Sequence, residues 1–509
     1  MFEKGIIMFN KNREAGILLH ITSLPSKYGV GTVGKKAYSF IRWMKKAGLK
    51  IWQILPLGPT SYGDSPYQSV SAMAVNYYLI DLDMLKDEGL LEEKDYKNVD
   101  FGNDPKRVNY EKLFNNRITV LKKAFSRFNK KNKEFVEFCK NEDYLDFGVF
   151  MTIKAMNNYN AWTEWPEEYR NYSQEVVEKV LNKYGNEVKF WQFTQFKFLQ
   201  QWKALKSFAN SNGIEIMGDI PLYIGGDSVE LWKYPELFIT DENHRPTLVA
   251  GCPPDCFTEF GQLWGNPVYD WDYSKKTNYA WWNKRIYNTF NLVDILRIDH
   301  FRGLDRWYAI ENGRPDAKIG EWKDGPKFDL FKDKTDLCIV AEDLGFIDEG
   351  VRILMRQTGY PGMKILEFAF DGHDDNEHKP TNTTPNYVVY TGTHDNMPLR
   401  QYIDDLNGHE RWVFVEDLKN QCNRINVPYT EEELSTSVGL TNKAVELAFA
   451  SVANTAIIPM QDFLALGGES RMNLPSTVST ANWSYRLNRG DTSIELAKRI
   501  KSLVKTYNR

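Results

Sequence analysis

Four acidic residues each stand at the carboxyl end of a short apolar run in this chain: Asp219, Asp299, Glu342 and Asp395. Arg297 and His300 flank Asp299. His394 precedes Asp395. One acid at the end of a strand is usually a helix cap or a loop residue. Four acids on one face of a protein repel one another, which costs free energy, so such a cluster indicates a functional site.

Three chemistries use carboxylates that converge in this way. A divalent metal ion suits several Asp and Glu oxygens, but Arg297 beside Asp299 would repel the ion. Aldolase-type barrels need a lysine at a strand end, and none of these runs supplies one. Glycoside chemistry needs one carboxylate as nucleophile and one carboxylic acid as proton donor. The residues fit this last chemistry, and the 15 Trp and 27 Tyr offer aromatic surfaces for sugar rings.

Eight short β-rich runs have to position these residues. Each run is almost continuously apolar and turns polar at its carboxyl end, which is typical of strands buried on both faces of a parallel sheet. Helical patterns follow several runs, at 37–49 and 349–359, and a last one covers 481–508. This alternation predicts an α/β fold, a (β/α)₈ TIM barrel. The runs span 16–21, 50–57, 215–222, 295–300, 337–344, 363–370, 387–395 and 455–463.

Two intervals are too long for a simple crossover between strands. The first lies between the second and third runs and predicts an inserted, mainly helical subdomain over 84–195. The second, 223–290, follows the third run and is rich in Gly, Pro and aromatic residues. Its segment 251–271 is interpreted as a long structured loop, an active-site lid. The chain is therefore predicted to be a single catalytic barrel over 1–509 with two insertions.

Composition narrows the class of protein further. The net charge is −4 with no long block of one sign, so no nucleic-acid partner is expected. No stretch is apolar enough for a signal segment or a membrane span. Five scattered cysteines favour a reducing, cytoplasmic compartment, and Cys252 with Cys256 would make a poor zinc site. We expect a monomer or a homodimer that needs no metal and no cofactor.

Motifs along almost the whole chain resemble those of the amylomaltases, the 4-α-glucanotransferases related to the α-amylase superfamily. The similarity runs from near residue 16 to near residue 487 and is highly specific. The first 15 residues precede it. The motifs are SLPSKYGVGTVG (23–34), WQILPLGPTSYGDSPYQS (52–69), MGDIPLYI (217–224), GCPPDCFTEFGQLWGNPVYDW (251–271), ILRIDHFRGL (295–304), VAEDLG (340–345), YTGTHDNMP (390–398) and NLPST (473–477).

The resemblance implies roles for the strand-end residues. Asp299 matches the catalytic nucleophile, and Glu342 matches the general acid/base. Asp395 matches the acid that holds the hydroxyls of the distorted sugar, with His394 beside it. Two further residues match positions that orient and charge-balance the nucleophile: Arg297 and Asp219.

Other residues are expected to contact the sugar chain. Within the lid these are Glu259 and Trp264, with Asn266 as a weaker candidate. Asp371, after the sixth run, is expected to face the same cleft. Packing of the loops onto the barrel is an equally good explanation for each aromatic residue taken singly. Four residues of the loop after the second run would line the donor side: Tyr62, Asp64, Ser65 and Tyr67.

The implied activity is transfer of α-1,4-glucan segments to the 4-hydroxyl of an acceptor glucan or glucose, by retaining double displacement. Maltooligosaccharides are the expected substrates. An α-1,4-glucan hydrolase with the same acids, and a glycan-binding barrel without activity, are the alternatives. The mechanism requires Glu342 to be protonated near neutral pH, so we predict that burial and neighbouring carboxylates raise its pKa.

Overall fold

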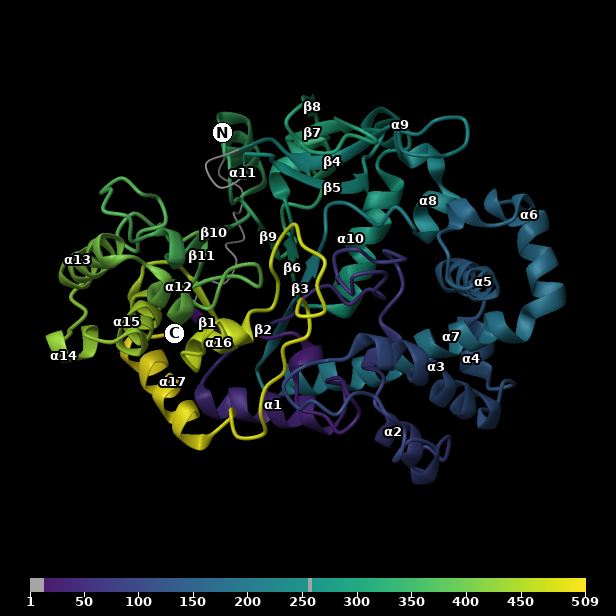
Figure 1. Ribbon diagram of the computed structural model, residues 1–509, viewed down its shortest axis with the longest axis horizontal. Coiled ribbons are helices and arrows are strands. Elements are labelled where there is room, and N and C mark those ends of the chain that lie inside the picture. Colours follow the sequence, from purple (N-terminus) through teal and green to yellow (C-terminus); the bar gives the residue numbers. More distant parts are fainter. Residues whose placement is uncertain (1–12, 255–258) are drawn as a thin grey trace.

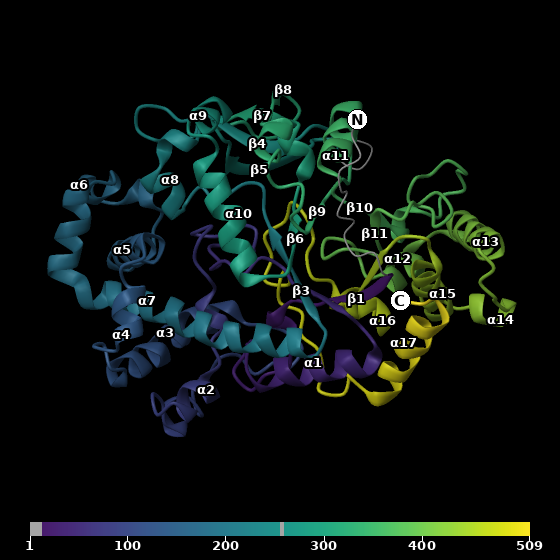
Figure 2. The same cartoon turned by 180° about the vertical axis from the view of Figure 1, so that it is seen from behind.

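The computed structural model describes residues 13–254 and 259–509 of the chain. Eight parallel strands form one sheet at its centre, and helices cover the outer side of the sheet (Figures 1 and 2). Every predicted run contributes one of these strands. In chain order they are β1 (Glu14–Leu18), β2 (Ile51–Gln53), β3 (Glu215–Ile220), β6 (Ile295–Ile298), β9 (Ile339–Ala341), β10 (Gly362–Ile365), β11 (Tyr387–Tyr390) and β12 (Thr455–Pro459).

The eight strands close into a barrel. Apart from β9 and β10, each strand of the barrel pairs with the barrel strand that follows it in this order. The last strand, β12, pairs with β1, so that Glu14 lies opposite Thr455. Between β9 and β10 the amide of Ala341 donates a hydrogen bond of 2.9 Å to the carbonyl of Pro361. The predicted (β/α)₈ barrel is therefore confirmed. Its strands are buried along nearly their whole length, which explains their continuous apolar sequences.

Two helices around the barrel show local signals at one of their ends. Helix α1 (Lys35–Ala47) ends at Gly48, whose φ of 81° lies in the left-handed region that glycine adopts without strain. Helix α11 (Glu349–Thr358) is capped by Asp348, whose side chain accepts a hydrogen bond from the amide of Val351. These two helices correspond to the patterns at 37–49 and 349–359.

The segment between β2 and β3 is helical and extends from one end of the molecule (Figures 1 and 2). Its last helix continues unbroken across residue 195 and feeds β3, with non-helical dihedral angles at Tyr184 that mark a kink. The helices are α2 (Leu82–Asp87), α3 (Tyr110–Arg127), α4 (Lys133–Phe138), α5 (Glu142–Met156), α6 (Glu167–Arg170) and α7 (Gln174–Ser211).

A four-stranded antiparallel sheet stands above the barrel, and the sequence did not predict it. It combines strands from both sides of β6 in the order β5–β4–β7–β8. Residues of β4 and β7 form a small separate core of this sheet, which contains Val249, Tyr308 and Ile310. The predicted lid, 251–271, thus begins in β4, contains β5 and reaches the start of α9. The elements in this region are α8 (Val229–Lys233), β4 (Leu248–Cys252), β5 (Gln262–Pro267), α9 (Trp271–Lys276), α10 (Ala280–Leu292), β7 (Arg306–Glu311) and β8 (Glu321–Asp324).

The predicted helix over 481–508 is wrong in its first part. Helix α17 begins only at Ile494, because Asn488–Asp491 form a turn and Ser493 caps the helix. Cys256 lies outside the described residues. In the part of the chain that is described, no helix is both long and apolar enough to cross a membrane. The C-terminal helices are α12 (Leu399–Asp405), α13 (Gly408–Arg424), α14 (Glu431–Leu434), α15 (Ser437–Ala450), α16 (Met460–Phe463) and α17 (Ile494–Thr506).

Candidate active site

Three adjacent strands place three of the four acids. Asp219 lies in β3 directly opposite Arg297 of β6. Asp299 follows β6 immediately, and Glu342 follows β9 immediately. Residues two apart on a strand point to the same side, so the side chains of Arg297 and Asp299 share one face. The strand pairing alone therefore brings these groups to one edge of the barrel.

A buried guanidinium connects two of these acids. Arg297 contacts Asp219 through Nη1 at 2.6 Å and Asp299 through Nη2 at 2.9 Å. The side chain of Arg297 is 4% exposed and that of Asp219 is fully buried, whereas Asp299 keeps 28% of its side-chain surface exposed. Two hydrogen-bonded contacts to one planar cation fix the orientation of both carboxylates. Asp299 is thus held in place while it stays accessible to a ligand.

Glu342 is held beside Asp299 by backbone donors. Its Oε2 accepts a hydrogen bond of 2.7 Å from the amide of His300, the residue next to Asp299, and its Oε1 accepts one of 2.9 Å from the amide of Leu344. Burial, with the charge on Asp299 as the second cause, raises the pKa of Glu342 to about 8, although Arg297 acts in the opposite direction. Glu342 is therefore protonated at neutral pH, as predicted, and can serve as an acid.

The fourth acid is held by a segment that follows β12. The side-chain amide of Asn473 donates a 2.7 Å hydrogen bond to the Asp395 carboxylate. Arg471 donates one of 2.7 Å to the backbone carbonyl of Asp395. The second carboxylate oxygen of Asp395 lies 3.3 Å from Nε2 of His394. The turn that carries His394 and Asp395 is thus held by hydrogen bonds from the segment after β12.

Tyr67 connects the buried pair of Arg297 and Asp219 to the turn that carries His394. Its hydroxyl donates a 2.7 Å hydrogen bond to Asp219, and its ring stacks on that of His394 with centroids 4.9 Å apart. The ring of Trp483 lies 5.8 Å from Tyr67 and 5.9 Å from His394. The structure therefore brings together all three predicted catalytic acids with Arg297, Asp219, His394 and Tyr67.

Three residues of this site were not predicted from the sequence. Asn473 and Arg471 contact the turn of Asp395, and Trp483 packs against its aromatic neighbours. Asn473 begins the NLPST motif, which could have pointed to it. Trp483 lay in the part of the chain predicted as helix, where it instead adopts a positive φ of 62°.

The other residues of the loop after β2 lie around Tyr67. Tyr62 is 89% exposed. Asp64 adopts a positive φ of 57°, and burial raises its pKa to about 6. The Ser65 hydroxyl accepts a hydrogen bond of 3.2 Å from the amide of Tyr67. Ser65 therefore shapes the turn that presents Tyr67, while Tyr62 projects into solvent.

The lid residues differ in their surroundings. The ring of Trp264 meets that of His300 edge-on at 4.8 Å, so the lid reaches the residue next to Asp299. Glu259 is largely exposed and pairs with Lys318 at 3.3 Å. Asn266 is buried and donates a 2.6 Å hydrogen bond to the carbonyl of Ile224, a structural contact.

Asp371 lies in the loop after β10. It is exposed, and it accepts hydrogen bonds from the amide of His373 at 3.0 Å and from the side chain of Asn376 at 2.9 Å. These contacts stay within the loop after β10.

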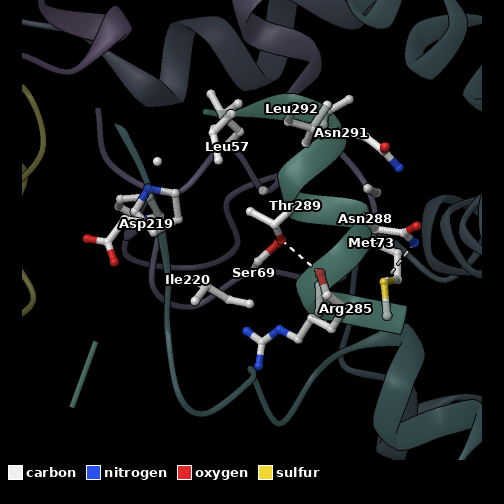
Figure 3. A pocket seen from close by; sticks show the side chains of 18 of the residues that line it. Leu57, Ser69, Met73, Asp219, Ile220, Arg285, Asn288, Thr289, Asn291 and Leu292 are labelled. Carbon is white, nitrogen blue, oxygen red and sulfur yellow. Dashed lines mark hydrogen bonds between the residues drawn. The ribbon is translucent and has the colours of Figure 1, made fainter. Parts of the chain in front are cut away.

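A cavity of about 530 Å³ lies beside Asp219 and Tyr67, between β3, α7 and α10. Figure 3 shows Asp219 at its edge, with the carboxylate pointing away from Asn288 and Asn291 of α10. Of the four acids, Asp219 is the one that lines this cavity. The cavity therefore lies behind the group of acids and is not the place where they meet.

Comparisons with known proteins agree on one family. A family model described as 4-alpha-glucanotransferase matches residues 19–492. A 4-alpha-glucanotransferase of Clostridium butyricum is 44% identical over 96% of this chain and 100% of its own length. One of Thermus thermophilus is 39% identical over 98% of this chain and 99% of its own.

Solved structures extend the agreement to the fold. The amylomaltase of Streptococcus agalactiae in complex with acarbose has a TM-score of 0.91 at 39% identity and covers 98% of this chain and 99% of its own. The amylomaltase of Corynebacterium glutamicum, at 17% identity, has a TM-score of 0.77 and covers 98% of this chain and 75% of its own, which supports the fold alone.

Proposed function

Because the chain belongs to the 4-α-glucanotransferase family, we propose catalytic roles for its clustered acids. The enzyme transfers α-1,4-glucan segments to the 4-hydroxyl of an acceptor glucan or glucose. The observation that carries the proposed roles is the placement of Glu342, which is protonated near neutral pH, beside the accessible carboxylate of Asp299. One acid and one ionised carboxylate form the pair that cleavage of a glycosidic bond uses.

In the first step the Asp299 carboxylate attacks the anomeric carbon of the donor glucan. Glu342 gives its proton to the departing glycosidic oxygen, so the shortened glucan leaves with a new 4-hydroxyl. The remaining glucan segment stays bound to Asp299 through an ester bond at its anomeric carbon. In the second step Glu342, now ionised, takes the proton of the acceptor 4-hydroxyl. That oxygen attacks the anomeric carbon, and Asp299 leaves as a carboxylate.

The neighbouring residues support these two steps. Arg297 and Asp219 keep the nucleophile oriented through the ion pairs described above. Asp395, oriented by Asn473, binds sugar hydroxyls whose contacts strengthen as the ring distorts. Tyr67 and His394 offer stacked rings against which a sugar can pack. The amylomaltase of Streptococcus agalactiae was solved with acarbose, and we expect acarbose to bind at the same acids here.

Incubation with maltotriose alone tests the activity. Transfer of a maltosyl segment from one maltotriose to another releases glucose and gives maltopentaose, and repeated transfers build a ladder of longer maltooligosaccharides, because a sugar hydroxyl accepts the glycosyl group. Chromatography of the products would show this ladder. Short products without any elongation would instead identify a hydrolase in which water is the acceptor.

The pH dependence of the reaction tests the role of Glu342. Burial and the charge on Asp299 raise its pKa to about 8, so the protonated acid is present below this pH and is lost above it. We expect kcat/KM to fall about tenfold per pH unit above about pH 8. Initial rates measured between about pH 5 and pH 10 would show this limb. A kcat/KM that already falls about tenfold per pH unit from pH 5 upward, as the ordinary glutamate pKa of about 4.3 would give, would contradict the assignment.

A further inference from the structure

The loop that carries Asp395 is shaped from within by the side chain of Asn396. This loop, 391–398, connects β11 to α12. The amide of Asp395 donates a hydrogen bond of 3.3 Å to the hydroxyl of Thr393. The side-chain oxygen of Asn396 accepts two hydrogen bonds from Thr393, one of 2.9 Å from the amide and one of 2.8 Å from the hydroxyl. Asn396 therefore fixes the turn from which the Asp395 side chain projects.

A buried acid that follows β10 holds the other end of the Asn396 side chain. Glu367 is 7% exposed, and its Oε1 accepts a hydrogen bond of 2.9 Å from the side-chain nitrogen of Asn396. The amide of Glu367 donates one of 3.0 Å to the carbonyl of Thr391. The two loops meet because β10 pairs with β11, and both strands lie close to α12 in each view (Figures 1 and 2). Glu367 thus reaches the turn of Asp395 through Asn396.

The carboxyl group of Glu367 is largely uncharged near pH 7. Burial raises its pKa to about 8, although the hydrogen bond from Asn396 acts in the opposite direction. A neutral glutamine has almost the same shape, and its carbonyl oxygen accepts the same hydrogen bond. Replacement by glutamine therefore removes the acid and keeps the contact, whereas an apolar side chain removes both.

A second buried acid holds the two ends of the same loop. Asp462 of α16 accepts hydrogen bonds from the hydroxyl of Thr391 and from the amide of Leu399, the first residue of α12. These contacts do not involve Glu367 or Asn396. Loss of the contact between Glu367 and Asn396 should therefore loosen the middle of the loop, where Asp395 stands, while both ends stay attached to the barrel.

We propose that Glu367 is a positioning residue, which acts through Asn396 and Thr393 to hold Asp395 where it binds the hydroxyls of the distorted sugar. The proposal rests on the role proposed for Asp395 above. Contacts to these hydroxyls strengthen in the transition state, so a misplaced Asp395 weakens the transition state more than the bound substrate. Loss of Glu367 should therefore lower kcat and leave KM almost unchanged.

Initial rates of maltotriose conversion by two variants of Glu367 test the proposal. Methionine is similar in size, but its thioether is only a weak acceptor. Glu367→Met should lower kcat about 10- to 100-fold, the usual cost of displacing a group in the active site by about 1 Å. KM should stay within about twofold of the parent value. Glu367→Gln keeps the acceptor and should keep kcat within about twofold.

A double-mutant cycle shows whether Glu367 acts through Asn396. Asn396→Ala removes both hydrogen bonds to Thr393 and should lower kcat at least as much as Glu367→Met. In the Asn396→Ala background, Glu367→Met should lower kcat by less than about a further twofold. An equal loss in both backgrounds would overturn the proposal. Asn396 is only half-buried, so Asn396→Ala tests the contact even if Glu367→Met does not fold, and an unchanged kcat would then overturn the proposal.

Gln201→Met is the matched control for the loss of a buried hydrogen bond. Gln201 is 2% exposed on α7, and its side chain accepts a hydrogen bond of 2.8 Å from the amide of Asp81. Its replacement should leave kcat unchanged. The proposal would be overturned if Glu367→Met kept the parent kcat, if Glu367→Gln lost as much activity as Glu367→Met, or if only KM changed.

Asp395→Asn separates this proposal from the proposed function. If Asp395→Asn loses kcat while Glu367→Met and Asn396→Ala keep it, the positioning role alone is wrong. If Asp395→Asn keeps the parent kcat, the role of Asp395 is wrong, and the positioning role fails with it. Failure of the proposed activity itself would appear as a parent enzyme that makes no product ladder.

Discussion

Replacing Glu342 with glutamine is expected to lower kcat for maltotriose conversion by about 10²–10⁴-fold, the usual contribution of general acid–base catalysis. Glutamine has nearly the same shape, and its single carbonyl oxygen can still accept one of the two backbone hydrogen bonds, from His300 or from Leu344, but it cannot give a proton to the departing oxygen. The loss should therefore appear in kcat, with little change in KM, because the missing interaction belongs to the transition state. Initial rates of glucose release would measure both constants.

Glu349→Gln is the matched control for this variant. The Glu349 side chain is 67% exposed on α11 and pairs with Arg356 at the surface. Its replacement should leave kcat unchanged. If Glu342→Gln kept more than a tenth of the parent kcat, Glu342 could not be the general acid, and the assignment of the acids would have to be revised.

Replacing Arg297 with methionine should lower the free energy of unfolding by about 3–5 kcal/mol, the usual cost of leaving a buried charge without its partner. Asp219 would lose its 2.6 Å contact while its side chain remains fully buried. Asp299 would lose the donor that fixes its orientation, so activity should fall as well. Urea unfolding monitored by tryptophan fluorescence would measure the change in stability.

Two further variants test whether the loss of stability comes from breaking the buried ion pair or from removing any arginine. Arg314→Met removes an exposed contact to Glu311 and should cost less than about 1 kcal/mol. Adding Asp219→Asn to Arg297→Met removes the orphaned charge and should restore part of the lost stability. A loss below 1 kcal/mol in Arg297→Met would show that the two charges are not coupled in this way.

The barrel and its acids could be predicted because their signals are local. A parallel strand buried on both faces is apolar along its length, so β6 and β9 stand out in the sequence. Asp299 and Glu342 follow these strands directly, and the closure of the barrel then brings them together.

The partners of Asp395 could not be predicted in the same way. Asn473 is 78 residues away along the chain, and its contact depends on how the segment after β12 folds back over the barrel. Trp483 lies in a stretch whose apolar spacing resembles a helix, but the turn at Asn488–Asp491 ends that pattern. The antiparallel sheet joins β4 to β7 across β6, and its short strands carry weak signals.

The pairing of β1 with β12 has a consequence for biosynthesis. Residues are added from the amino terminus, so all the acids up to Asp395 are made before Thr455, where β12 begins. Until β12 emerges from the ribosome, β1 and β11 each have an unpaired edge, and such edges invite association with other chains. A chain that stops before residue 455 lacks the strand that closes the barrel, so we expect it to be inactive and prone to aggregate although it contains all four acids.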